Sequence, residues 1–125
     1  MNTTPITIAG NAADIPELRF TPAGKATARL RVAVTSRYQD STGAWTDGAT
    51  SWHTVILWGT PAENAVESIA KGDRVIVHGR LEQREYQTEA GDRRTTWEIT
   101  AEEIGVSLRY ATAKPVKITR GASAA

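Results

Sequence analysis

The segment at residues 51–77 decides the fold of this 125-residue chain: SWHTVILWGTPAENAVESIAKGDRVIV. Its first eight residues predict a strand that becomes apolar on both faces, as in the centre of a sheet. Thr60 as N-cap and Pro61 at the first helical position then predict a helix, with Gly72 just past its end. The helix has an apolar stripe at helical spacing, formed by Ala62, Ala65, Val66, Ile69 and Ala70. A second strand follows, so the segment predicts strand, helix and strand in succession.

Further strands are predicted on both sides of this segment. The clearest covers residues 26–37, where apolar side chains alternate with polar ones that include Arg29, Arg31 and Arg37. This pattern is typical of a half-buried strand with a basic outer face. The other predicted strands cover residues 6–10, 51–58, 75–86 and 93–106.

The order of these elements is three strands, one helix and two strands. A helix between the third and fourth of five strands is the arrangement of the oligonucleotide-binding (OB) barrel. The sequence therefore predicts a mainly β protein, a five-stranded OB-fold barrel with one α-helix between strands 3 and 4. Residues 39–50 are rich in Asp, Ser, Thr and Gly, and they predict a long flexible loop.

Composition limits the class of protein. With 15 basic and 14 acidic residues the formal net charge is +1, which argues against a protein that coats duplex DNA by charge alone. No apolar run approaches the roughly 18 residues of a membrane span, and the first residues lack a signal-peptide pattern. The absence of cysteine excludes a disulfide scaffold and a thiolate zinc site, and it fits a reducing cytoplasm.

No catalytic or metal-binding motif is present in the sequence. The two histidines, His53 and His78, form no ligand set with cysteine, and a strand histidine more often has a local hydrogen bond or an interface role. Glu102 and Glu103 are strand neighbours, so they point to opposite faces and cannot act as a pair. Neither a glycine-rich phosphate loop nor a serine nucleophile elbow occurs. The sequence predicts a protein that is not an enzyme, with no cofactor and no metal.

The aromatic residues are unusual in type, because four of the eight are Trp. A small core is normally filled by residues without polar atoms, so this excess predicts tryptophans on a surface. Trp52 and Trp58 share one face of their strand, roughly 20 Å apart at about 3.3 Å per residue. Tyr38 ends the basic strand, and Tyr86 lies near Arg84. Flat rings between arginines are typical of single-stranded nucleic-acid binding, because bases stack on the rings and cations contact the phosphates.

The residues alone leave other placements of these rings open. Trp52 and Trp58 also suit the core, and Tyr38 has the parity of core residues unless a bulge intervenes. Trp97 suits edge packing or a subunit interface, and Trp45 either anchors its loop or stacks on a base.

Positive charge is concentrated in one part of the chain. Between residues 18 and 39 there is no acid, whereas a solvated strand face normally mixes both signs. The basic residues of this stretch are Arg19, Lys25, Arg29, Arg31 and Arg37. The local basic surface favours an anionic partner, although the net charge is close to zero.

Motifs along almost the whole length resemble those of bacterial single-stranded DNA-binding proteins. They lie at residues 6–11, 14–24, 50–53, 58–59, 62–63, 71–75, 79–81 and 91–93. The sequence SLRYATA at residues 107–113 is similar to the actinobacterial type. The resemblance implies a C-terminal extension strand after the barrel, which clamps neighbouring subunits.

The resemblance also implies what the protein does. It implies a homotetramer of OB barrels that wraps single-stranded DNA without catalysis, in replication, recombination and repair, in the cytoplasm at the nucleoid. The stacking positions that it implies are Tyr38, Trp52, Trp58 and Tyr86, and the contacts to the DNA backbone are Lys71 and Arg84. The charge pattern adds Arg29, Arg31 and Arg37 as phosphate contacts. His53 falls at a position of subunit contact in the family.

We expect a single-stranded DNA-binding domain over residues 1–110 and a basic, flexible tail over residues 111–125. Family members usually end in a short acidic tip that recruits other proteins, whereas residues 114–125 hold three basic residues and no acid. The resemblance therefore supports DNA binding more than the recruitment of protein partners. Two other functions stay open: an OB-fold protein-assembly module with weak DNA affinity, and an RNA-binding barrel, because stacking does not sense the 2′-hydroxyl.

Overall fold

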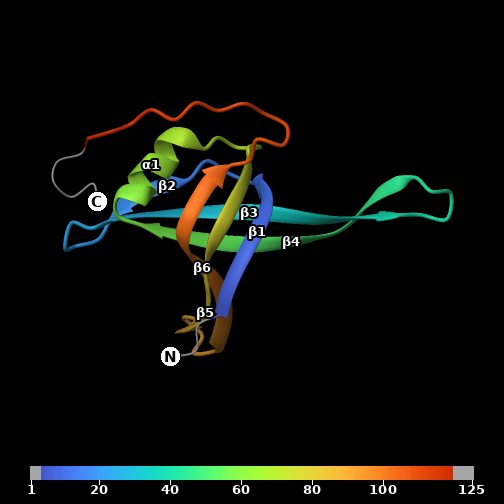
Figure 1. Ribbon diagram of the computed structural model, residues 1–125. Helices are drawn as coiled ribbons and strands as arrows, with labels where there is room; N and C mark the ends of the chain where they lie inside the picture. Colours follow the sequence, from blue (N-terminus) through green and yellow to red (C-terminus); the bar gives the residue numbers. More distant parts are fainter. Residues whose placement is uncertain (1–3, 120–125) are drawn as a thin grey trace.

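The computed structural model describes residues 4–119, which form six strands and one helix (Figure 1). The elements are β1 (Thr4–Ala12), β2 (Glu17–Phe20), β3 (Ala26–Gln39), β4 (Trp45–Trp58), α1 (Thr60–Ser68), β5 (Arg74–Gln87) and β6 (Arg93–Val106). The strands lie in the order β1-β5-β6-β4-β3-β2, and an additional pairing of β1 with β3 closes the sheet into a barrel. β4 and β6 pair in parallel. The predicted OB fold, with its helix between the third and fourth barrel strands, is confirmed, and β2 is a short strand beyond the five predicted.

The interior of the barrel is filled by aliphatic side chains, and no aromatic residue is buried among the described residues. The largest fully buried side chains are Leu30, Leu57, Ile99, Val32, Val55, Val75 and Val77. Ala62, Ala65 and Ile69 of the helix segment join the same cluster. Burial of each large aliphatic side chain contributes about 1.5–3 kcal/mol, so the core that stabilises the barrel is aliphatic. The tryptophans are therefore free to lie on the surface, as their number in the sequence predicted.

Two long strands continue past this core as a two-stranded arm. β3 runs to Gln39 and β4 begins at Trp45, and the two residues are paired (Figure 1). The prediction of a flexible loop over residues 39–50 is therefore wrong. An arm with solvent on both faces needs no apolar alternation, so its polar composition gave no strand signal.

The tip of this β3–β4 arm is a turn organised by Asp40. Its carboxylate accepts hydrogen bonds from the backbone N–H groups of Thr42, at 2.8 Å, and Ala44, at 3.1 Å. The Thr42 hydroxyl donates a further bond of 2.6 Å. These bonds, with that of the Thr42 hydroxyl foremost, lower the pKa of Asp40, so the charged form that holds the turn persists to lower pH than in an ordinary Asp.

The helix starts and ends slightly differently from the prediction. Gly59, at φ 72°, is the N-cap residue and Thr60 is already helical, so the assignment of Thr60 as N-cap is wrong. Gly59 also donates its N–H to the carbonyl of Ala26, at 2.9 Å, and this bond attaches the helix start to β3. The helix ends at Ser68, so Gly72, at φ 92°, lies in the turn before β5 rather than directly after the helix.

The segment after β6 differs from the expected extension strand. Ser107 donates its N–H to the carbonyl of Arg74, at 2.8 Å, but residues 107–119 contain no strand. A strand needs a neighbour to pair with, and the resemblance places that neighbour in another subunit. The predicted C-terminal extension strand is therefore absent from the described residues of this single chain. The boundary at residue 110, with a separate tail, stays a prediction.

Candidate nucleic-acid interface

Basic and aromatic side chains share the outer surface of β3 and β4. We call this surface the strand face, and it consists of Lys25, Arg29, Arg31, Trp52 and Trp58. In the antiparallel register Trp52 is opposite Ala33, and Trp58 is opposite Thr27. Residues directly opposite each other in a sheet lie on the same face. The other face of β4 carries Val55 and Leu57, both buried in the core, so the strand face lies directly above packed side chains.

A cation lies over each of the two tryptophan rings. The guanidinium carbon of Arg31 is 5.0 Å from the ring centroid of Trp52, and Nζ of Lys25 is 5.1 Å from that of Trp58. These distances fall within the range of favourable cation–π contact. Trp52 is 56% exposed and Trp58 is half-buried. Neither ring belongs to the core, which decides the placement that the sequence left open.

The strand face offers unpaired positive charge as well as flat rings. Arg29 and Arg31 point outward from β3, and neither takes part in an ion pair among the described residues. Phosphate groups attract such cations, while bases stack on tryptophan for about 1–3 kcal/mol each. Lys25 belongs to the basic stretch of the sequence but was not predicted as a DNA contact. Because its Nζ lies over the ring of Trp58, it is part of the strand face. The arrangement can hold a chain of stacked bases and phosphates.

The predicted pair Arg84 and Tyr86 lies on β5, two strands away from β4. β6 lies between β4 and β5. Its residue Glu98 is opposite Thr54 of β4 on one side and Glu82 of β5 on the other, so these three residues share one face of the sheet. Tyr86 is 52% exposed and available for stacking. Arg84, however, forms an ion pair of 2.7 Å with Glu98, whose side chain is only 13% exposed. A role of Arg84 toward phosphate thus competes with an existing contact.

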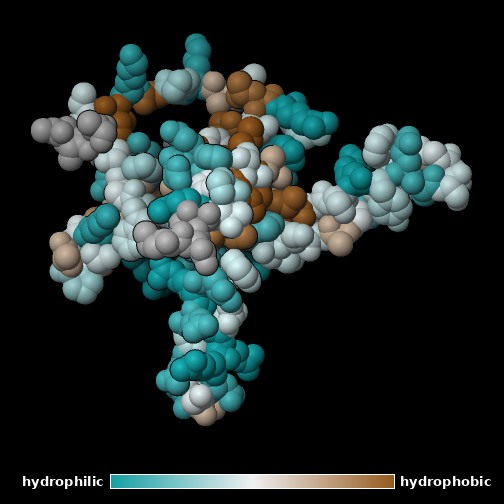
Figure 2. Space-filling view, turned by 60° about the horizontal axis from the view of Figure 1, so that its bottom comes forward, coloured by the Kyte–Doolittle hydropathy of each residue, from teal (hydrophilic) through white to brown (hydrophobic). Residues whose placement is uncertain are grey.

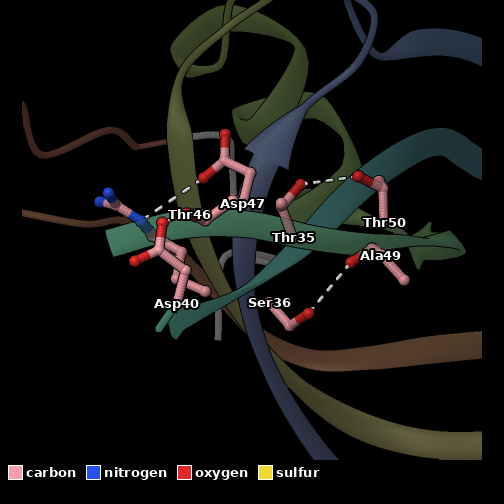
Figure 3. Close-up of polar contacts among 8 residues, drawn as sticks. Thr35, Ser36, Asp40, Thr46, Asp47, Ala49 and Thr50 are labelled. Atoms are coloured by element: carbon pink, nitrogen blue, oxygen red, sulfur yellow. Dashed lines mark hydrogen bonds and ion pairs between the residues drawn. The ribbon is translucent and has the colours of Figure 1, made fainter. Parts of the chain in front are cut away.

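Tyr38 lies on the β3–β4 arm and is 52% exposed. The register of β3 and β4 shifts between the pairs Thr35–Thr50 and Arg37–Asp47, so the extra residue lies on β4 and the alternation of β3 is unchanged. Tyr38 is exposed because this part of the arm extends past the core, with solvent on both faces. Gly48 fits closely here, since a Cβ on it would lie 2.6 Å from Oγ of Ser36 and 3.4 Å from the Tyr38 ring. Figure 3 shows the cross-strand contacts that hold this part of the arm, Thr35 to Thr50 and Ser36 to Ala49.

Three further predicted residues lie elsewhere. Arg37 is on the arm and forms an ion pair with Asp47, at 3.4 Å. Lys71 is exposed in the turn after α1, where the N–H of its neighbour Gly72 donates to a carbonyl of β1. His53 is half-buried opposite Val32. Its place in a subunit contact stays a prediction.

A second group of basic and aromatic residues was not predicted to lie together, although Arg37 was predicted as a phosphate contact and Trp45 was left open as a stacking residue. It lines an open cleft of about 540 Å³ between the arm and the chain that follows β6. The lining residues are Thr35, Arg37, Trp45, Arg74, Arg109 and Tyr110. They come from three distant segments, so no spacing in the sequence joins them. We call this group the arm cleft.

Within residues 4–119, no cluster of His, Asp and Glu has the geometry of a metal site. No helix in the same part of the chain is long and apolar enough to cross a membrane.

The fold and the strand face define a class of protein: a small OB barrel with an exposed surface of basic and aromatic residues. Residues 3–107 match the model of the single-strand binding protein family. The chain therefore belongs to the single-strand binding protein family. This confirms the resemblance seen in the sequence.

Individual relatives agree with this assignment. A single-stranded DNA-binding protein of Mycobacterium bovis is 51% identical over 118 residues, which cover 94% of this chain and 72% of the relative. Single-stranded DNA-binding protein 2 of Streptomyces coelicolor is 50% identical over 115 residues, or 91% of this chain and 58% of the relative. These relatives confirm the actinobacterial type. A crystal structure of a small single-stranded DNA-binding protein from Streptomyces coelicolor superposes with a TM-score of 0.74 at 44% identity, covering 86% of this chain and 97% of that one.

Proposed function

We propose that this protein binds single-stranded DNA without sequence preference, as a binding protein and not as an enzyme. The observation that carries the proposal is the pairing of Arg31 with Trp52 and of Lys25 with Trp58 on one open face of the barrel. Each pair offers a ring for one base and a cation for the adjacent phosphate. The names of the relatives support the same ligand.

The remaining predicted residues extend the path of the strand. Tyr38 on the β3–β4 arm and Tyr86 on β5 are further exposed rings outside the strand face. Arg29 and Arg37 supply positive charge along β3, and Lys71 and Arg84 supply it at greater distance. We infer that the protein protects exposed strands during replication, recombination and repair, in the cytoplasm at the nucleoid.

Assembly into a homotetramer is part of this proposal. Ile76 of β5 is 45% exposed although it lies on a barrel strand, and such an apolar residue favours a covering neighbour. We expect His53 to lie in a subunit contact. Sedimentation of the free protein measures the mass directly, and a monomer would contradict the tetramer without affecting the strand face.

The test of the function is a titration of tryptophan fluorescence with poly-dT at several salt concentrations. We expect strong quenching, and a log–log dependence of affinity on salt with a slope of about −0.7 for each phosphate contacted. Competition between dT and rU oligomers separates DNA from RNA binding. Tighter binding of rU would favour the RNA-binding barrel, and a stable oligomer without appreciable dT affinity at low salt would favour the assembly module.

A further inference from the structure

Glu98 of β6 carries a carboxylate that is nearly covered, although it lies on the outer surface of the barrel. Its side chain is only 13% exposed, and its Oε1 lies 2.7 Å from Nε of Arg84 on β5. A largely buried carboxylate is costly unless a cation or a hydrogen-bond donor accompanies it, and Arg84 supplies that cation. The side chain of Arg84 is itself 58% exposed. One covered acid therefore holds one cation that faces solvent.

The atom of Arg84 that lies closest to Glu98 is Nε, the guanidinium nitrogen next to the side-chain stem. Nε carries one of the five N–H donors of an arginine, and the terminal nitrogens Nη1 and Nη2 carry the other four. An ion pair centred on Nε leaves terminal donors for a second anion. Competition between Glu98 and a phosphate for Arg84 is therefore partial, and the two anions can be bound together.

A second carboxylate, that of Glu82 on β5, is opposite Glu98 but has a partner of its own. The hydroxyl of Thr100 donates a hydrogen bond of 2.6 Å to Oε1 of Glu82. Like charges directly opposite each other in a sheet repel, and Arg84 offsets this repulsion at Glu98. The guanidinium is thus attracted to one place on the surface, where its long side chain is more ordered than a freely solvated arginine.

The place at which Glu98 holds Arg84 belongs to the same outer surface as the strand face. Thr54 of β4 is opposite Glu98. Because β4 and β6 are parallel, the step from Thr54 to Trp52 runs in the same direction as the step from Glu98 to Thr96, and Thr96 is opposite Arg84. Arg84 therefore lies on the Trp52 side of Glu98.

Tyr86 continues this surface along β5. It is 52% exposed and lies two residues after Arg84, so both side chains are on the same face of the strand. Figure 2 shows that the end of the β5–β6 hairpin projects from the body of the protein with a mainly hydrophilic surface. Arg84 thus stands between two exposed rings, Trp52 and Tyr86, where a phosphate between stacked bases needs a cation.

We propose that Glu98 is a positioning residue for DNA binding, which orients the guanidinium of Arg84 so that its terminal donors meet a phosphate of the bound strand. A long cationic side chain normally loses rotamer freedom when it binds a ligand, and this loss lowers the affinity. Because Glu98 already orders Arg84 in the free protein, less freedom is lost on binding. The inference rests on the proposed function, in which Arg84 contacts the DNA backbone, and adds to it an acidic residue.

The experiment compares the affinities of full-length variants for oligo-dT at low salt, by fluorescence anisotropy. We expect Glu98→Ala to weaken binding about 2- to 12-fold, the effect of immobilising one long side chain on binding. Glu98→Gln keeps the length of the side chain and an acceptor oxygen for Nε, so it should retain most of the wild-type affinity. A purely electrostatic effect of Glu98 has the opposite sign, because removing a negative charge strengthens the binding of a polyanion.

The matched control is Glu85→Ala, which removes the same charge next to Arg84 but from the other face of β5. Glu85 is opposite Thr95 and has no ion pair among residues 4–119. We expect this variant to bind at least as tightly as the wild type. Urea denaturation checks that each variant is folded. If Glu98→Ala is unfolded under the assay conditions, Glu98→Thr replaces it, because threonine suits a strand but is too short to reach Nε.

The Arg84→Ala background shows whether Glu98 acts through Arg84. In that background Glu98→Ala should cause no further loss of affinity, because the side chain that it orients is gone. An equal loss with and without Arg84 overturns the proposal, and so does unchanged or tighter binding by a folded Glu98→Ala protein. In both cases tight binding of oligo-dT by the wild type leaves the proposed function intact. If the wild type does not bind oligo-dT, both fail.

Discussion

The strand face and the arm cleft have the same chemistry but are built in different ways. The strand face lies on two neighbouring strands, with Val55 and Leu57 buried directly beneath it. The arm cleft is assembled from an arm, the start of β5 and the chain after β6, and the arm has no core beneath it. The rings and cations of the strand face are therefore supported by the packed core, whereas those of the arm cleft are not.

This difference predicts unequal contributions to binding. Ordering a mobile segment costs free energy, and that cost is subtracted from the contact energy. Side chains above a packed core lose little conformational entropy when the ligand binds. Most of their stacking energy therefore contributes to affinity. We expect the strand face to dominate the affinity for single-stranded DNA. Three variants test the strand face, the support of the barrel surface and the charge of the arm, in order of decreasing effect.

The largest effect is expected for Trp52→Ala combined with Trp58→Ala. Two lost base stacks, at about 1–3 kcal/mol each, correspond to a loss of affinity for oligo-dT of 100-fold or more. Fluorescence anisotropy of a labelled oligomer measures this loss. The double variant should still fold, because neither ring belongs to the core, but its thermal midpoint should fall modestly because Trp58 is half-buried. Wild-type affinity in a folded double variant would refute the role of the strand face.

A second variant, Arg84→Ala, tests how much the ion pair between Arg84 of β5 and Glu98 of β6 contributes to the stability of the barrel. Its removal leaves the largely buried carboxylate of Glu98 without its ion-pair partner. We expect a loss of about 1–3 kcal/mol in the free energy of unfolding, measured by urea denaturation. The matched control is Arg29→Ala, which removes an exposed arginine without an ion pair and should leave stability unchanged. Equal stability of the two variants would mean that the Glu98 ion pair contributes nothing.

The smallest effect is expected for Asp47→Asn on the arm. The change releases Arg37 from its exposed ion pair and removes one negative charge beside the arm cleft. Exposed pairs are worth about 0.2–1 kcal/mol, so the affinity for long oligo-dT should rise only a few-fold at low salt. The gain should disappear at high salt, because the released charge is then screened. A gain that persists at high salt would indicate a rearranged arm rather than an electrostatic effect.

Much of the fold was predictable from local patterns. The alternation over residues 26–37 and the helical stripe after Pro61 each reflect one element burying one face. The β3–β4 arm was missed because a ribbon with solvent on both faces needs no such alternation. The short strand β2 also has no clear pattern, since its burial is nearly uniform and it pairs along one edge only.

The strand face was predictable from the sequence, whereas the surroundings of Arg84 and Tyr38 were not. Trp52, Trp58 and Arg31 were identified because neighbouring strands bring alternate residues onto one face. Arg84 was identified as well, but its ion pair with Glu98 depends on the pairing of β5 with β6, which spacing does not reveal. Tyr38 was assigned by family resemblance, and its exposure follows from the arm, which extends past the core with solvent on both faces.

The sequence by itself determined the barrel strands, the helix and the basic, aromatic strand face, because each depends on periodicity within a segment or between adjacent strands. Tertiary structure alone decided which cation lies over which ring, and it alone assembled the arm cleft. Arg74, Arg109 and Trp45 are brought together by the closure of the barrel and by the path of the chain after β6. Contacts between distant segments depend on the packing of the whole chain, so no local pattern encodes them.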